Sequence, residues 1–262
     1  MHDLVIRGGT IVDGTGEPSF VGDVAIDNGV ITSVGGTAGP GKEERDATGK
    51  LVSPGWVDVH THYDGQATWD PELAPSSWQG VTTVMFGNCG VGFAPCKPTD
   101  HEALIDLMEG VEDIPGIVLD EGLKWDWESF PEFLDALERQ PRAIDVAAQM
   151  PHHPLRVYVM GQRAIDFEDA TDDDIEQMRE LTAEALKAGA FGFTTSRTES
   201  HRTTKGERVP GRYAAHDELI GIGKAFKEVD HGAYGMLNDF EDEEAEFEWM
   251  KTVGNETGRP LW

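Results

Sequence analysis

Two histidines and one cysteine lie where two neighbouring apolar segments of the sequence end. His60 and His62 follow the segment 54–59, and Cys89 follows the apolar run 81–86 within Gly87-Asn88-Cys89-Gly90. Residues two apart in a strand point to the same face, so the two imidazoles would project together. Imidazole and thiolate are preferred ligands of zinc. We therefore predict that His60, His62 and Cys89 bind one or two divalent ions, most simply zinc. The alternatives are two surface histidines and a small buried cysteine in a tight loop.

Three further side chains that could contact a substrate follow later strands. His152 comes after the third strand of the expected barrel, and Arg197 and His201 come after the fourth. Basic groups at that end of a sheet would hold a substrate carboxylate, because arginine pairs with carboxylates through two parallel hydrogen bonds. An ordinary polar loop is the alternative at each position. Cys96, between Pro95 and Lys97, is interpreted as incidental.

The first 55 residues are typical of β-hairpins. Short apolar runs occupy residues 4–6, 10–12, 24–26 and 30–32, and Asn28-Gly29 between the last two is a strong hairpin signal. Residues 35–49, rich in glycine and charge, are expected to form a loop. This pattern predicts a small β segment over residues 1–53.

From residue 51 onward, short apolar runs alternate with stretches of helical spacing. Strands are expected at 56–59, 81–86, 144–148, 191–195 and 233–237, and helices at 99–110, 127–139, 172–189, 216–229 and 241–253. Such alternation predicts a parallel sheet, here a (β/α) barrel, whose active site would lie at the carboxyl ends of the strands.

The number of strand–helix units is too small for a closed barrel. About five units and the start of a sixth at 259–262 are present, whereas a closed barrel has eight and occupies about 250 residues. We therefore expect an α/β protein with a small N-terminal β-sandwich segment (1–53) and an incomplete (β/α)8 barrel (54–262). The sheet would be an open crescent of five or six parallel strands, and the chain would stop partway round the barrel.

Composition excludes several classes of partner. With 21 basic and 49 acidic residues the formal net charge is −28, and such a field repels nucleic acid. No apolar run reaches the length of about 18 residues that crosses a membrane, and the start of the chain lacks a secretory pattern. Two cysteines cannot build a disulfide framework, so a reducing cytoplasm is the simplest location. An oligomer is compatible with the sequence.

Four segments of the chain resemble a known family. Residues 60–66 (HTHYDGQ), 80–84 (GVTTV), 87–95 (GNCGVGFAP) and 155–161 (LRVYVMG) are similar to the N-acyl-D-amino-acid deacylase (D-aminoacylase) branch of the amidohydrolase superfamily. The resemblance runs from about residue 3 to the end. It implies a small β-sandwich beside a metal-bearing barrel, and a zinc hydrolase of N-acyl amino acids or related amides. His60 and His62 would hold one metal, and Cys89 would replace the carboxylated lysine used elsewhere in the superfamily. In agreement, the segment 191–197 has no lysine.

The sequence departs from the family pattern in two places. The fifth strand of the family normally ends in a metal-binding histidine, but residues 233–239 contain none. Asp239 is a candidate oxygen ligand in its place, whereas His231 precedes the strand. The sixth-strand histidine and the aspartate expected to act as general base would lie beyond Trp262. We therefore assign no catalytic base within this chain. The alternatives are another cyclic-amide amidohydrolase of the dihydropyrimidinase kind, and a catalytically incompetent fragment or homologue.

Overall fold

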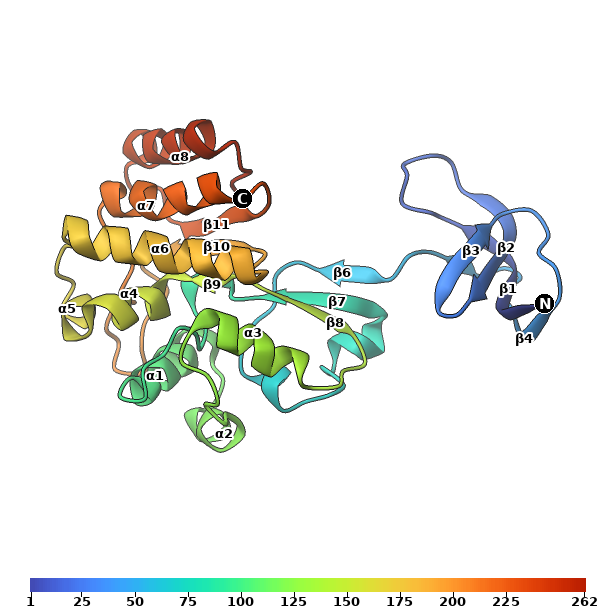
Figure 1. The fold of residues 1–262 in the computed structure, drawn as a ribbon, viewed down its shortest axis with the longest axis horizontal. Helices are drawn as coiled ribbons and strands as arrows, with labels where there is room; N and C mark the ends of the chain where they lie inside the picture. Colours follow the sequence, from blue (N-terminus) through green and yellow to red (C-terminus); the bar gives the residue numbers. More distant parts are fainter. The chain divides into compact units, whose positions relative to one another are not determined.

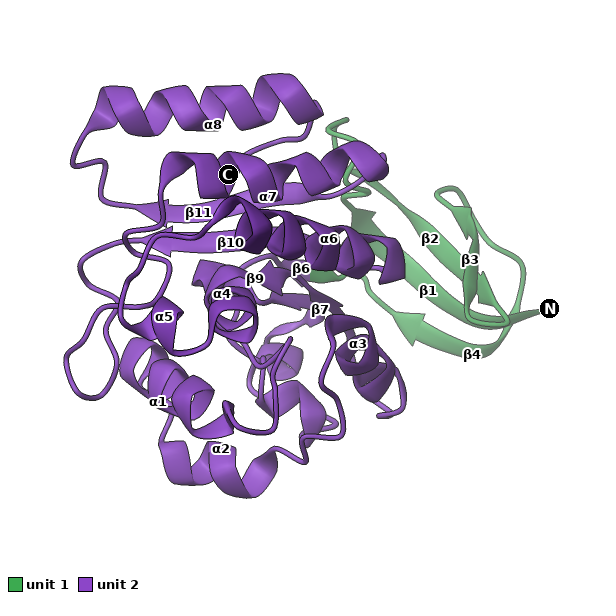
Figure 2. Ribbon diagram, turned by 60° about the vertical axis from the view of Figure 1, so that its left-hand side comes forward, with its two compact units in different colours: residues 1–56 green, residues 57–262 purple.

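A computed structural model describes residues 1–262, which form two compact units, residues 1–56 and residues 57–262 (Figure 2). Each unit is described separately below. No helix in the structure has the length and apolar character needed to cross a membrane.

The N-terminal unit is a single five-stranded sheet. Its strand order is β3-β2-β1-β4, and β5 also pairs with β1. The strands are β1 (His2–Ile11), β2 (Phe20–Asp27), β3 (Val30–Val34), β4 (Gly41–Asp46) and β5 (Leu51–Val52). β2 and β3 are antiparallel and meet at Asn28 and Gly29, both of positive φ, so the predicted hairpin is confirmed.

Two expectations for this unit were wrong. Residues 4–6 and 10–12 belong mainly to one continuous strand, β1, rather than to a hairpin. Gly8 has a φ of +61°, and the pairing of β1 with β2 shifts register between Ile6 and Gly9, so the glycines make a bulge and not a reversal. The expected loop at 35–49 contains β4, which pairs in parallel with β1. β4 is charged and exposed, so no apolar alternation marked it in the sequence.

The second unit contains six short strands arranged in chain order. Two three-stranded sheets have the orders β6-β7-β8 and β9-β10-β11. The strands are β6 (Trp56–Asp58), β7 (Val81–Phe86), β8 (Asp145–Ala148), β9 (Met150–Pro151), β10 (Gly192–Arg197) and β11 (Ala233–Asn238). β7 pairs in parallel with β8, and β10 pairs in parallel with both β9 and β11. Only Gln149 separates β8 from β9, so one stretch of chain serves both sheets. Leu261 makes a parallel bridge to Tyr234 of β11, as expected for the start of a further strand.

Eight α-helices accompany these strands. They are α1 (His101–Glu112), α2 (Gly116–Gly122), α3 (Phe130–Glu138), α4 (His152–Met160), α5 (Gln162–Ile165), α6 (Asp172–Ala188), α7 (His216–Gly223) and α8 (Glu243–Thr257). α6 begins where the sequence predicted, because the Thr171 hydroxyl accepts from the Asp174 amide and the Asp174 carboxylate accepts from the Thr171 amide. The sequence did not indicate α2, α4 or α5.

The core of this unit lies between the strands and the helices. Figures 1 and 2 show α6, α7 and α8 stacked alongside β10 and β11. Phe193 and Tyr234 of these strands are fully buried, as are Leu186 of α6 and Leu219 of α7. This packing fixes the strands, and so the loops at their carboxyl ends.

Candidate metal centre

The backbone around Cys89 is tightly held at the end of β7. Cys89 has a φ of +56° and lies between Gly87 and Gly90, which also have positive φ. The Gly87 amide donates to Asp64 Oδ1 at 2.8 Å, and the Gly90 amide donates to Thr194 Oγ1 at 3.0 Å. These hydrogen bonds hold the loop and thereby fix the position of the Cys89 thiol.

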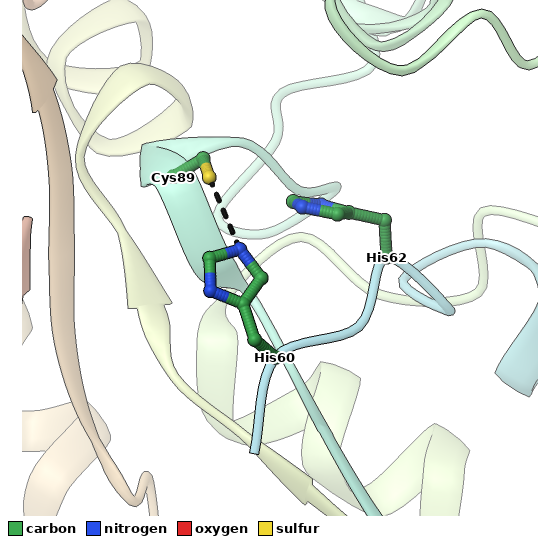
Figure 3. A group of neighbouring side chains, drawn as sticks. All are labelled: His60, His62 and Cys89. Carbon is green, nitrogen blue, oxygen red and sulfur yellow. Dashed lines mark hydrogen bonds between the residues drawn. The ribbon is translucent and has the colours of Figure 1, made fainter. Parts of the chain in front are cut away.

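His60 and His62 are positioned by the residue between them. The amide and hydroxyl of Thr61 both donate to the Met85 carbonyl of β7, at 3.0 and 2.8 Å. Thr61 is thereby buried against β7, and the two imidazoles lie beside Cys89 (Figure 3). His60 Nε2 is 3.3 Å from Cys89 Sγ.

The donor atoms of these three residues are close enough for a single ion. One ligand atom from each of His60, His62 and Cys89 lies within 4.8 Å of the others. In a tetrahedral zinc site, bonds of about 2.0–2.3 Å place two ligand atoms about 3.3–3.8 Å apart, and the 3.3 Å from His60 Nε2 to Cys89 Sγ agrees with that spacing. In addition, His62 Nδ1 is buried and has no hydrogen-bond partner. The donor set and its spacing therefore fit a zinc ion.

A further side chain of the site, Glu112, is the last residue of α1 and was not expected from the sequence. Its Oε1 lies 3.3 Å from His62 Nε2. Glu112 also forms a second close group with Cys89 and His201, again with ligand atoms within 4.8 Å of one another. No sequence signal distinguished Glu112 from the other acidic residues of α1, because its contact with His62 depends on tertiary packing.

The buried surroundings of the site favour the neutral forms of its titratable side chains. Burial, followed by the nearby Glu112 and Asp64 carboxylates, raises the pKa of Cys89 to about 12. Burial and Asp113 raise the pKa of Glu112 to about 7. Burial, together with His60 and His201, lowers the pKa of His62 to about 4. A bound cation would favour the thiolate and the carboxylate.

His152 and Arg197 both bond to internal partners in the structure. His152 begins α4 and is fully buried, and its Nδ1 and Nε2 lie 2.8 Å from Thr195 Oγ1 and Glu218 Oε1. The Arg197 guanidinium is buried and bonds the carboxylate of Glu246. Internal partners thus occupy both side chains in this structure, and contact of these two residues with a substrate stays a prediction.

The candidates near β11 lie apart from these groups. Asp239 Oδ2 accepts from the Glu199 amide at 2.6 Å and belongs to neither group of close ligand atoms. His231 Nε2 lies 3.1 Å from the Leu186 carbonyl. Of the three weaker candidates from the sequence, His152, Arg197 and His201, only His201 has a ligand atom within 4.8 Å of Cys89 Sγ.

The chain belongs to the amidohydrolase family, whose sequence model matches residues 43–262. It is 37% identical over 196 residues to a D-aminoacylase of Alcaligenes xylosoxydans xylosoxydans, covering 74% of this chain and 37% of that protein.

Two solved structures are similar over nearly the whole chain. One is a D-aminoacylase described as having a binuclear metal centre, with a TM-score of 0.75, 30% identity, and coverage of 100% of this chain and 51% of the other. The second is an N-acyl-D-glutamate deacylase from Bordetella bronchiseptica complexed with zinc and a phosphonate inhibitor, with a TM-score of 0.78 and 31% identity. The coverage there is 99% of this chain and 50% of the other. The chain thus spans about half or less of the length of these relatives. The similarity confirms a mixed α/β fold of the D-aminoacylase kind.

Proposed function

We propose that this chain carries the metal-binding part of a metal-dependent hydrolase that cleaves the amide bond of N-acyl amino acids. The observation that carries the proposal is the convergence of His60, His62 and Cys89, with Nε2 of His60 3.3 Å from Sγ of Cys89. Membership of the amidohydrolase family and similarity to deacylases of N-acyl-D-amino acids support it.

Each residue of the site has a defined role in this proposal. His60 and His62 bind as neutral imidazoles, and burial keeps His62 neutral at pH 7 by lowering its pKa to about 4. Cys89 binds as the thiolate and gives up its proton on binding. A zinc ion held there would acidify water and polarise the scissile carbonyl. Because no catalytic base is assigned among residues 1–262, we propose that a carboxylate from outside this chain accepts the proton of water and delivers it to the amine.

We also propose an incomplete barrel for the second unit. The strands β6 to β11 follow one another in chain order, and no pairing joins β11 to β6. Relatives of about twice the length, with structures that match over the whole chain, support this arrangement. The single sheet of residues 1–56 is then one part of a β-sandwich. A cytoplasmic location and action on a small-molecule amide belong to the same proposal, with two free cysteines and a net charge of −28 in support.

A non-catalytic homologue is the second candidate. β11 ends in Leu237-Asn238 without a histidine, which removes one metal ligand expected from the family resemblance. A dihydropyrimidinase-like enzyme is less well supported, because β10 contains no lysine.

Metal analysis joined to an amide-hydrolysis assay tests the proposal. In a longer protein that contains this chain, we expect bound zinc and amine release from N-acyl-D-amino acids. His62→Ala should lose both, whereas His231→Ala, outside the site, should keep both. A wild-type protein with zinc but no turnover would favour the non-catalytic homologue, and one without zinc would exclude the metal site.

A further inference from the structure

His153, the second residue of α4, is a buried histidine with no part in the proposed metal binding. Its side chain is fully buried, and it belongs to neither group of close ligand atoms around Cys89. The Gly211 amide donates to His153 Nδ1 at 3.1 Å, whereas Nε2 is buried without a hydrogen-bond partner. Because most buried polar atoms are paired, the group that Nε2 faces indicates what this histidine does.

The hydrogen bond from Gly211 determines which nitrogen of His153 carries the proton. Burial, followed by the neighbouring His152 and His201, lowers the pKa of His153 well below its ordinary value, so the ring is neutral. A neutral imidazole has one nitrogen that donates and one that accepts. Since Nδ1 accepts from Gly211, the proton lies on Nε2, and Nε2 is a donor.

This donor faces the loop that carries Cys89. A Cβ on Gly90 would lie only 3.0 Å from His153 Nε2. The Cys89 backbone is also close enough to raise the pKa of His153, as an accepting carbonyl does. Because Gly211 occupies Nδ1, Nε2 is the nitrogen that faces this carbonyl, although it does not complete a hydrogen bond in the structure.

The peptide between Cys89 and Gly90 therefore has a polar neighbour on each side. Its N–H, from Gly90, donates to Thr194 Oγ1 at 3.0 Å, and its carbonyl lies beside His153. Cys89 itself is in the left-handed region, with φ 56° and ψ 14°. A residue other than glycine is strained there by about 1–2 kcal/mol, so contacts with the surroundings must maintain this conformation.

The ring of His153 is held in place from α4. The preceding His152 contacts Glu218 of α7, and Arg156, one turn further along α4, donates to the same carboxylate oxygen at 2.9 Å. A Cβ on Gly211 would lie 2.7 Å from Nδ1 of both histidines, so the loop after β10 also packs closely against them. The first turn of α4 thus provides a firm support for the loop after β7.

We propose that His153 is a positioning residue for the metal ligand Cys89: in the metal-loaded chain its Nε2–H donates to the Cys89 carbonyl and holds the peptide that directs the thiol toward the metal. This inference rests on the proposed function of the position formed by His60, His62 and Cys89. A group that supports a metal ligand typically contributes about 10–100-fold to metal affinity. A histidine that only fills the core would affect stability and leave the metal site unchanged.

Two substitutions of His153 separate these roles. The amide oxygen of asparagine can take the place of Nδ1, so His153→Asn keeps an acceptor for Gly211 and removes the donor that faces Cys89. Glutamine reaches the place of Nε2 with its amide N–H, so His153→Gln restores that donor. His231→Asn, which replaces an exposed histidine before β11, is the matched control.

Cobalt(II) titration of the 262-residue chain measures the effect on the site. The absorption band of thiolate bound to cobalt reports on the metal–sulfur bond, and the titration gives the affinity. We expect His153→Asn to weaken the band and to lower the affinity by about 10–100-fold. His153→Gln and His231→Asn should keep the band and the affinity of the wild type. Urea unfolding of each variant records any change in stability separately.

A measurement that needs no change of fold complements the titration. With ¹⁵N in histidine and ¹³C in the cysteine carbonyls, solid-state NMR of the zinc-loaded wild type should show a dipolar coupling between a protonated histidine nitrogen and a cysteine carbonyl. This coupling should be absent from His153→Gln, which lacks that nitrogen.

The outcomes distinguish this inference from the proposed function. The inference would be overturned by a missing coupling in the wild type, by an unchanged cobalt band and affinity in His153→Asn, or by equal losses in His153→Asn and His153→Gln. Each of these results would leave the proposed metal site standing. A wild-type chain that binds no cobalt would instead refute the proposed function, and this inference with it.

Discussion

At the scale of single residues, the site depends on which cysteine is placed beside the histidines. Cys89 and Cys96 are both buried and unpaired, but only Cys89 lies near His60. Cys89→Ala should weaken zinc binding by more than about 100-fold, because it removes a direct ligand rather than a supporting group. Cys96→Ala should bind zinc as the wild type does. Isothermal titration of zinc into both variants measures the difference, and equal affinities would remove Cys89 from the site.

The types and spacing of His60, His62 and Cys89 were enough to predict that the three side chains meet. Strand periodicity and the common carboxyl edge of parallel strands are local rules that a sequence displays. Glu112 lay outside the reach of those rules, because its place beside His62 depends on how α1 packs. The pairing of Arg197 with Glu246 was not predictable for a related reason, because its buried partner lies 49 residues further along the chain.

At the scale of elements, the loop after β7 requires a residue without a side chain at position 87. A Cβ on Gly87 would lie 2.2 Å from the Gln149 carbonyl oxygen, and φ there is +77°. Gly206 has a similar φ of +82°, but nothing lies within 4 Å of a Cβ. Gly206→Ala should cost about 1 kcal/mol from backbone strain alone. Gly87→Ala should cost about 3 kcal/mol or more, because the overlap adds to the strain.

Urea unfolding of the two glycine variants measures that contrast. Equal losses of unfolding free energy would show that the loop relaxes away from Gln149.

The conformational freedom of glycine also explains why the sequence predicted a hairpin where the structure has the single strand β1. Gly8-Gly9 permits either a turn or a bulge, and pairing with β2 on one edge and β4 on the other selects the bulge.

The contact between α8 and β10 predicts a pH dependence of stability. Burial alone would raise the pKa of Glu246, but hydrogen bonds from Arg197, Trp249 and Asn238 outweigh it and lower the pKa to about 2. A carboxyl with a depressed folded-state pKa stabilises the protein above its unfolded value, here 4.5, and this stabilisation is lost as the pH falls toward 2. The contribution at pH 7 is on the order of 3 kcal/mol.

Denaturant unfolding at pH 7 and at pH 3 tests the role of Glu246. Glu246→Gln should be clearly less stable than the wild type at pH 7, and the gap should shrink at pH 3. Glu248→Gln, on the exposed side of α8, is the matched control and should change little at either pH. A gap for Glu246→Gln that does not change with pH would contradict the assigned cause.

At the scale of the whole molecule, apolar side chains remain uncovered along β6 and the segment after it. Trp56, Val57 and Val59 are each more than half exposed. Exposed apolar edges of this kind favour association, while a net charge of −28 opposes it. The order of strands and the count of units were predictable from alternating apolar runs. The exposure of these three side chains was not predictable, because it depends on tertiary packing that the apolar runs do not show.

The last prediction concerns activity and rests on the proposed incomplete barrel. The 262-residue chain should release no measurable amine from N-acyl-D-amino acids, even with zinc added. The reason is that the proposed water-activating carboxylate lies outside this chain. Loss of a general base typically lowers the rate by about 10²–10⁴-fold. A longer protein that contains this chain should hydrolyse such substrates, and Cys89→Ala in it should lower both zinc content and turnover. The assay follows amine release over a panel of N-acyl-D- and N-acyl-L-amino acids. Robust turnover by the 262-residue chain would place the base inside it, with Glu112 beside His62 as the first residue to substitute.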